Sequence, residues 1–296
     1  MRTGALVVGT PAVPGQRHEG DVPGARAGEG MGNAMKLCMM SYTMARQGVG
    51  VEEIVRCAEE LGLEGIDWVS TYGRDARELR ALSDAAGLTV ACHTFFLRSF
   101  PEGDGWLDEA KQGIDDAVAL GAPVVMIPTG TRPEMDRSEF RRRWIDALAE
   151  IMPFAREAGV ILTVENFPGA ASAFVTAVDF YEAQRQVPGL KLTFDNGNAA
   201  SGEDPVASFR QCAADVVHIH LKDWTVRSTP AEGYRQMLDG RYYRPALIGE
   251  GDMPTAECWQ AFREAGYGGY INIEYEGNEI PAAEAMRRAV SYLRSL

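Results

Sequence analysis

From Lys36 to the C-terminus, short apolar runs alternate with amphipathic stretches of helical length. The runs are rich in Val, Ile and Leu, and in the stretches that follow them apolar residues recur every three or four positions, a pattern typical of strands and helices in alternation. We count eight such units, and their predicted strands are Lys36–Ser41, Gly65–Ser70, Leu88–His93, Pro123–Pro128, Val160–Asn166, Leu190–Asp195, Val216–Leu221 and Tyr270–Glu274.

Several predicted helices carry their own end signals. Gly62 closes the helix Val51–Leu61, and Gly87 closes Glu78–Ala86. The same order of helix, glycine and strand returns at Gly121, Gly159 and Gly266. Eight such units without a linker predict an α/β protein, a single (β/α)8 TIM barrel over residues 35–296. A doubly wound sheet is disfavoured because no glycine-rich dinucleotide motif follows the first strand.

Residues 1–34 differ from this pattern, being rich in Gly, Pro, Ala and Arg. Their longest apolar run, Ala5–Val8, is far shorter than the core of a signal peptide. We interpret 1–34 as a disordered leader or as a start codon called too early, with Met31 or Met35 as the alternative start. No stretch approaches the roughly 18 apolar residues of a membrane helix, so no membrane partner is expected.

Charge and cysteine content narrow the partners and the compartment. Lys and Arg number 29 against 42 Asp and Glu, a formal net charge of -13, which disfavours nucleic acid and favours a small-molecule partner. The five cysteines are an odd number, widely spaced and without a CxxC motif. They indicate reduced thiols and a cytoplasmic location.

Ligand-type residues end four consecutive predicted strands. Glu165 stands in VEN, Asp195 in FDNGN, His220 in HIHLKD and Glu274 in IEYEG. In a barrel these strand ends meet at the face that carries the active site. Converging carboxylates repel one another unless a cation lies among them. Three carboxylates and one imidazole suit one divalent ion, with Mn²⁺ favoured and Mg²⁺, Co²⁺ and Zn²⁺ compatible.

From about Lys36 onward the chain resembles the xylose-isomerase-like barrel superfamily, the sugar-phosphate isomerase/epimerase group that includes ketose 3-epimerases, hydroxypyruvate isomerase and inosose dehydratase. HIHLKD, GEGDMP (Gly249 to Pro254) and GYGGYINIE carry the resemblance best. It implies that Glu165, Asp195, His220 and Glu274 bind the metal and that Glu165 and Glu274 are also the proton-transfer pair. It further implies a carbohydrate substrate, and homo-oligomers are common in the family.

The chemistry of the residues agrees with that activity. Removing a proton next to a carbonyl builds negative charge on oxygen, which a chelated cation stabilises as an enediolate. Carboxylates on both faces of the substrate then take and return protons. We therefore expect a metal-dependent sugar or keto-sugar isomerase or epimerase. The alternative is a lyase or dehydratase acting on a keto-sugar, a keto-inositol or an oxidised glycoside, because loss of a leaving group needs the same base and metal.

Further residues near the strand ends are candidates for binding the substrate, each with a simpler alternative. His93 binds a hydroxyl or is structural, and Asp67, where many family members carry a pocket glutamate, otherwise pairs with an arginine. Lys222 binds a substrate oxygen or a carboxylate, or pairs with Asp223 at the surface. Aromatic side chains form a sugar platform or merely close loops, and Trp68, Phe96 and Trp224 are favoured for the platform among Tyr42, Trp68, Tyr72, Phe95, Phe96, Phe167 and Trp224.

Two residues next to the predicted metal ligands are of the same type but are not expected to bind the metal. His218 points the same way as His220 but is expected one layer deeper, held by hydrogen bonds. Glu276 is expected to be solvated or to support a ligand. The segment Trp224–Arg244 exceeds the usual loop length and predicts a lid or an oligomer contact. In it, Arg227, Arg241 and Arg244 meet an anionic substrate or solvent.

Three other classes of protein are disfavoured. An endonuclease acting at abasic sites shares the superfamily, but its three-metal site is rich in histidine and this chain has only four histidines. A barrel that only binds or assembles is disfavoured because all four ligand positions are filled. The third alternative is an α/β barrel whose strand-end acids have no role in metal binding. In that case the substitutions Glu165→Gln, Asp195→Asn and Glu274→Gln would leave metal binding unchanged.

Overall fold

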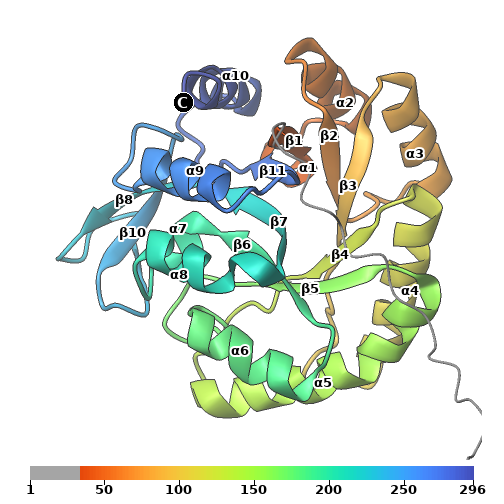
Figure 1. Cartoon of the computed structure of the whole chain (residues 1–296), viewed down its shortest axis with the longest axis vertical. Helices are drawn as coiled ribbons and strands as arrows, with labels where there is room; N and C mark the ends of the chain where they lie inside the picture. The colour runs from red at the N-terminus through yellow and green to blue at the C-terminus, as the bar shows by residue number, and fades with distance from the viewer. Residues whose placement is uncertain (1–33) are drawn as a thin grey trace, which may run out of the picture. The chain divides into compact units, whose positions relative to one another are not determined.

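Eight parallel strands close into a barrel in the computed structural model, which describes residues 34–296 (Figure 1). The strands follow one another around the ring in the order β1-β11-β7-β6-β5-β4-β3-β2. They are β1 (Lys36–Met40), β2 (Gly65–Val69), β3 (Thr89–Thr94), β4 (Val124–Ile127), β5 (Ile161–Glu165), β6 (Lys191–Asp195), β7 (Val216–Leu221) and β11 (Tyr270–Ile273). The predicted barrel is thus confirmed, and every strand end lies within one residue of its predicted position. The prediction of a leader over 1–34 lies, Ala34 apart, outside the described residues.

Helices cover the outside of the barrel (Figure 1). They are α1 (Ser41–Ala45), α2 (Val51–Glu60), α3 (Ala76–Ala85), α4 (Trp106–Leu120), α5 (Arg137–Ala158), α6 (Ala177–Gln186), α7 (Asn196–Ala199), α8 (Pro205–Cys212), the 3₁₀ turn η1 (Ala213–Asp215), α9 (Thr255–Glu264) and α10 (Ala282–Leu293). The glycine signals operate as expected at α4 and α5, where Gly121 and Gly159 take the left-handed conformation at φ 75° and 73°.

Side chains alternate between the helices and the barrel interior along each strand. On β2, Trp68 packs against α3 while its neighbour Asp67 points into the barrel, where it accepts a hydrogen bond from Asn272 on β11. Thr163 and Thr193 meet inside the barrel at 2.8 Å. The interior therefore contains buried polar groups, and several of them are hydrogen-bonded across strands.

The long segment after β7 folds into a small sheet of its own. β8 (Asp223–Arg227), β10 (Tyr242–Ala246) and β9 (Arg235–Gln236) pair antiparallel in the order β8-β10-β9, and β8 and β10 stand outside the ring of barrel strands in Figure 1. Trp224, Met237 and Tyr243 form its core. The Tyr243 hydroxyl donates to the carbonyl of Ala200, which ties the sheet to the end of α7.

All five cysteines are buried and unpaired, in agreement with reduced thiols; the cytoplasmic location, the absence of a nucleic-acid partner and the oligomeric state stay predictions. In the part of the chain that the structure describes, no helix is long and apolar enough to cross a membrane.

Candidate metal and substrate site

The four predicted metal ligands meet at the carboxyl ends of their strands. Glu165, Asp195, His220 and Glu274 each offer a ligand atom that lies within 4.8 Å of those of the other three. All four side chains are buried, with at most 4% of any residue exposed. Glu274 follows β11 but remains in register, because its backbone NH donates to the carbonyl of Leu221 at 3.0 Å. The structure thus brings these four side chains into one cluster.

The motifs around two of these residues explain how they are held. The Asn166 side chain donates to the carbonyl of Asp195 at 2.7 Å and accepts from its NH at 2.9 Å, which joins the ends of β5 and β6. Asp195 Oδ1 caps α7 by accepting from the NH of Asn198 at 2.7 Å. Only Oδ2 therefore remains to face the cluster.

His220 lies between two of the carboxylates. Its Nδ1 is 2.8 Å from Glu165 Oε1 and 3.6 Å from Glu274 Oε2. Burial lowers the pKa of His220, but its contacts with Asp67 and Glu165 outweigh burial and raise the pKa well above its ordinary value. These two carboxylates thus favour the charged form of the imidazole.

Lys222 supplies a second positive charge inside the cluster. Its Nζ lies 2.9 Å from Glu274 Oε1 and 3.3 Å from Asp195 Oδ2, and the residue is 4% exposed. Burial lowers the pKa of Lys222, but Asp195 and Glu274 outweigh it and raise the pKa above its usual value. The alternative prediction, a surface ion pair between Lys222 and Asp223, is wrong. Asp223 instead accepts hydrogen bonds from backbone NH groups, including those of Gly249 and Gly251.

The donor set fits a divalent cation. Asp195 Oδ2 and Glu274 Oε2 are buried and have no hydrogen-bond partner among the described residues. Burial raises the pKa of Asp195 well above its ordinary value, and the neighbouring carboxylates Glu165 and Glu274 add to this rise while Lys222 opposes it. A bound cation would satisfy both orphaned oxygens and favour the ionised carboxylates. Hard oxygen donors with one imidazole suit metals of the Mn²⁺ or Zn²⁺ type.

A cavity of about 120 Å³ opens directly above this cluster. Glu165, Glu274 and Lys222 contribute its polar side. Its other lining residues are largely apolar, with Phe96 40% exposed at the rim, and the full apolar set is Met40, Tyr42, Val69, Phe96, Met126, Pro128, Phe167 and Pro168. Charged groups beside an apolar wall are typical of a small-molecule site.

Two predicted substrate contacts face away from this cavity. Trp68 is fully buried and donates its Nε1 to Ser83 Oγ of α3 at 3.1 Å. His93 Nδ1 lies 2.8 Å from the carbonyl of Trp68, and the pKa of His93 is lowered by burial. Both expectations of a pocket position are corrected, because strand alternation directs Asp67 and Thr94 inward and their neighbours Trp68 and His93 outward.

Two further residues that were predicted to bind the substrate, Asp67 and Trp224, are buried inside the protein and do not reach the cavity. Asp67 is fully buried and pairs with His218 and His220, not with an arginine. Trp224, in β8, is also fully buried, and the cationic groups of Lys222 and Arg235 lie 5.7 and 5.3 Å from the centre of its ring. Neither residue lines the cavity, so direct contact with a substrate is not supported for them. Phe96 and Lys222 do line it.

Two further charged residues reach the cavity. Arg235 of β9 lines it, and its Nη2 lies 3.7 Å from Glu276 Oε2, which is 3.9 Å from Lys222 Nζ. Glu276 thus lies between Lys222 and Arg235. Its expected role, either solvated or in support of a metal ligand, stays a prediction. Arg235 was not predicted, and the only signal for it was the unusual length of its segment. Outside the cavity, Arg241 pairs with Asp239, and Arg227 and Arg244 both stack on Tyr234.

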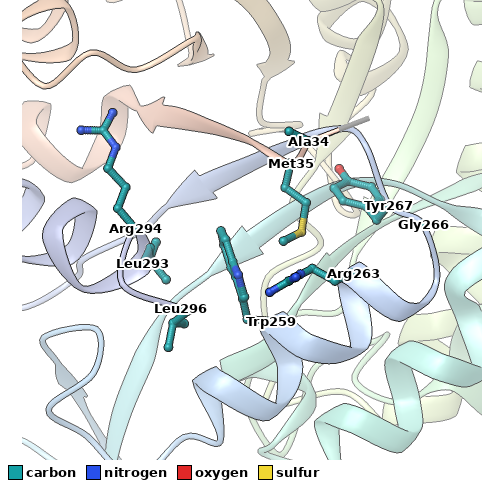
Figure 2. Close-up of a pocket in the computed structure, with 9 residues that line it drawn as sticks. All are labelled: Ala34, Met35, Trp259, Arg263, Gly266, Tyr267, Leu293, Arg294 and Leu296. Carbon is teal, nitrogen blue, oxygen red and sulfur yellow. The ribbon is translucent and has the colours of Figure 1, made fainter. Parts of the chain in front are cut away.

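A larger hollow of about 460 Å³ lies at the opposite ends of the strands. Figure 2 shows Trp259 and Arg263 of α9 there, near Met35 just before β1 and Tyr267 just before β11. No Asp, Glu or His is found among the described residues that line it. Because catalytic groups in such barrels gather at the carboxyl ends of the strands, we place the site in the smaller cavity.

Comparison with known proteins agrees with this architecture. A family model described as xylose isomerase-like TIM barrel matches residues 55–296. The inosose dehydratase of Lacticaseibacillus casei is 26% identical over 239 residues, which cover 73% of this chain and 78% of that protein. The fructoselysine 3-epimerase of Shigella flexneri is 24% identical over 260 residues, or 79% and 88% of the two chains.

Among solved structures, the IolI protein with a bound zinc atom superimposes with a TM-score of 0.72 at 16% identity, covering 88% of this chain and 96% of that one. The fold, the relatives and the matched family model agree, and this chain belongs to the xylose isomerase-like TIM barrel family.

Proposed function

We propose that this protein is a divalent-metal-dependent epimerase or isomerase that abstracts a proton next to the carbonyl of a small keto-sugar. One observation carries the proposal. Three carboxylates and one imidazole converge beneath a cavity, and two of the carboxylate oxygens, Asp195 Oδ2 and Glu274 Oε2, have no hydrogen-bond partner among the described residues. Burying such groups is costly unless a charge compensates them, which supports a cation as part of the working site.

The relatives support the same class of chemistry. One matched relative is an epimerase of a sugar derivative and another is a dehydratase, and a structural neighbour carries zinc. We propose one ion per chain, with Mn²⁺ favoured because three of the four ligands are carboxylates. When bound, the cation would neutralise the negative charge that builds on the substrate oxygen during proton removal.

Glu165 and Glu274 are proposed as the proton-transfer pair. Both line the cavity, and they approach His220 Nδ1 at 2.8 and 3.6 Å. They come from β5 and from the end of β11, so a substrate above His220 would have one carboxylate at either side. One removes the proton and the other returns it, which inverts the carbon if the two act on opposite faces.

The remaining lining residues are proposed to hold the substrate. The apolar wall, with Phe96 and Phe167, offers contact to the C–H face of a sugar ring. Lys222 Nζ, beside Glu274, points a hydrogen-bond donor at the same space. This arrangement suits a small carbohydrate with one ring.

The position of Lys222 also supports a second candidate, a dehydratase acting on a keto-sugar or keto-inositol. An ammonium 2.9 Å from one of the two carboxylates can give a proton to a departing hydroxyl while the other carboxylate removes the α-proton. The C–H electrons then form the new double bond, the C–O bond breaks and water leaves.

The metal is tested first. Protein purified without chelator and reloaded with Mn²⁺ is expected to hold about one ion per chain by plasma mass spectrometry, and Asp195→Asn is expected to lose it. Asp204→Asn is the matched control, because Asp204 caps α8 at the surface away from the site. A wild-type protein that holds no ion, or an Asp195→Asn protein that holds as much, contradicts the proposal.

The reaction class is tested in D₂O with keto-sugars and keto-inositols. An epimerase is expected to incorporate solvent deuterium at the carbon next to the carbonyl. Apart from the added deuterium, its product has the same mass as the substrate. A dehydratase yields a product lighter by one water. Glu165→Gln and Glu274→Gln are expected to lower kcat by at least about 100-fold, the usual contribution of a positioned acid or base. Retained exchange in both variants would refute the assigned pair.

A further inference from the structure

A second buried group lies against the metal cluster and shares one residue with it. Asp67 of β2 faces His218 and His220 of β7, and its Oδ2 is 3.5 Å from the Nε2 atom of each ring. All three residues are at most 1% exposed. Neither Nε2 atom makes a hydrogen bond to any described residue, and its 3.5 Å contact with Asp67 is an ion-pair distance. Among the described residues, Asp67 is therefore the carboxylate that both nitrogens face.

The Asp67 carboxylate is itself held in place. Asn272 Nδ2 donates to its Oδ2 at 2.7 Å, and Thr94 Oγ1 donates to its Oδ1 at 3.2 Å. Two neutral donors from β11 and β3 thus fix the orientation of the carboxylate. Because Asp67 does not line the cavity, any effect it has on the reaction passes through another residue.

His220 belongs to both groups through different nitrogens. Nδ1 faces Glu165 and Glu274, whereas Nε2 faces Asp67. A neutral imidazole carries its single proton on one nitrogen and offers only the other as a ligand. For Nδ1 to bind a cation, the proton must stand on Nε2.

We propose that Asp67 is a positioning residue that keeps the proton of His220 on Nε2 and so presents Nδ1 to the metal; this inference rests on the metal-dependent function proposed above. A carboxylate behind a ligating imidazole orients the ring and makes it a better ligand. This role explains a fully buried carboxylate that, among the described residues, pairs with no arginine or lysine and does not line the cavity. His218 faces the same oxygen but forms no ion pair with Asp195 or Glu274.

The first measurement needs no variant. Nitrogen-15 NMR of the wild-type protein loaded with Zn²⁺, which is diamagnetic, distinguishes the two ring nitrogens of His220. We expect a proton on Nε2 and metal on Nδ1. A loaded protein whose His220 carries the proton on Nδ1 would overturn the proposal directly.

The second measurement is the dissociation constant for Mn²⁺ by titration calorimetry. Asp67→Asn is expected to weaken binding by about 10- to 100-fold while the count stays at one ion per chain. His218→Gln is expected to leave the constant unchanged, because Thr94 and Asn272 still hold Asp67. Asp179→Asn is the matched control for loss of a buried aspartate, since Asp179 lies in α6 and is 4% exposed.

The outcomes separate this inference from the proposed function. Normal Mn²⁺ binding by Asp67→Asn overturns the positioning role while leaving the metal site standing. A wild-type protein that binds no ion refutes the proposed function and this inference together. Two ions in the wild type, one of them lost in Asp67→Asn, would show that Asp67 and the histidines bind a metal themselves, which also overturns the proposal.

Discussion

Lys222 illustrates how one residue gains its role from its surroundings. On the surface, a lysine next to an aspartate would contribute little to stability. Here its ammonium is buried between Asp195 and Glu274, where it neutralises acids that repel one another without a metal. The ammonium and a bound cation therefore compensate the same carboxylates.

Lys222→Met is expected to destabilise the metal-free protein by about 3 kcal/mol, because it leaves buried carboxylates uncompensated. A cation restores the charge balance, so the rise in Tm on adding Mn²⁺ should be larger in the variant than in the wild type. Lys191→Met is the control, since Lys191 pairs with Asp215 near the surface. Scanning calorimetry with and without Mn²⁺ gives both values. An equal rise in wild type and variant would contradict the shared compensation.

The surroundings also decide the roles of two aromatic residues, Trp68 and Phe96. Trp68→Phe removes the hydrogen bond to Ser83 and is expected to cost about 1 kcal/mol of stability with KM unchanged. Phe96→Ala is expected to raise KM severalfold with little effect on stability, because the ring is 40% exposed at the cavity. Urea unfolding and steady-state kinetics on both variants test this. If Trp68→Phe raised KM and Phe96→Ala changed only the stability, Trp68 rather than Phe96 would contact the substrate.

At the scale of elements, loops tie the strand ends into a rigid rim. Asp223 accepts backbone hydrogen bonds from Trp224, Gly249, Gly251 and Met253, which fastens the GEGDMP segment to the end of β7. A Cβ on Gly251 would lie 2.2 Å from Asp223 Oδ1, so the glycine is needed for this close approach. The motif that carried the family resemblance thus has a structural role.

Helices α5 and α6 are joined by a buried acid whose effect depends on pH. Asp179 caps α6 through the NH groups of Val175 and Thr176 and pairs with Arg137 and Arg141. Burial raises the pKa of Asp179, but these hydrogen bonds and Arg137 outweigh it and lower the pKa below its usual 3.8. The unfolded chain therefore takes up the proton first as the pH falls.

The stabilisation by Asp179 is expected to be complete above the pKa of the unfolded chain and to be lost as the pH falls through the lower folded value. At pH 6, Asp179→Asn should cost about 3 kcal/mol. The difference between wild type and variant should shrink steadily below about pH 4. Urea unfolding across this range measures it. A difference that stays constant down to pH 3 would show that the carboxylate charge is not responsible.

For the whole molecule, binding of the cation and folding are linked, because the four ligands come from four separate strands. They meet only when the barrel is closed, so the unfolded chain does not reproduce the site. A ligand that binds only the folded state stabilises it in proportion to the logarithm of its concentration.

Mn²⁺ at 100 times its dissociation constant is expected to stabilise the protein by about 2.7 kcal/mol. The Tm should rise by roughly 5 °C and fall again when EDTA removes the ion. Asp195→Asn should show almost no rise, whereas Asp204→Asn should behave like the wild type. Scanning calorimetry makes the comparison. A rise in Asp195→Asn as large as in wild type would place the ion elsewhere.

Local patterns in the sequence were sufficient for the barrel and for the four residues of the cluster. Hydrophobic periodicity identified all eight strands, because each strand is a short apolar segment and, except after β7, the next element is a helix. Glu165, Asp195, His220 and Glu274 were predicted because the carboxyl ends of parallel strands in a closed barrel meet at one rim, and the structure brings them together there. The family resemblance was needed to choose Glu274 over Glu276 and supported His220 over His218.

Only the tertiary structure decided which way the neighbouring side chains point and which groups they meet. Alternation along β2 forbids Asp67 and Trp68 from sharing a face, and the structure shows that the acid points inward while the indole points outward. The partners of Lys222 and the approach of Arg235 join residues from separate strands and from the added sheet. Such contacts depend on strand register and on long-range packing, which one-dimensional spacing does not encode.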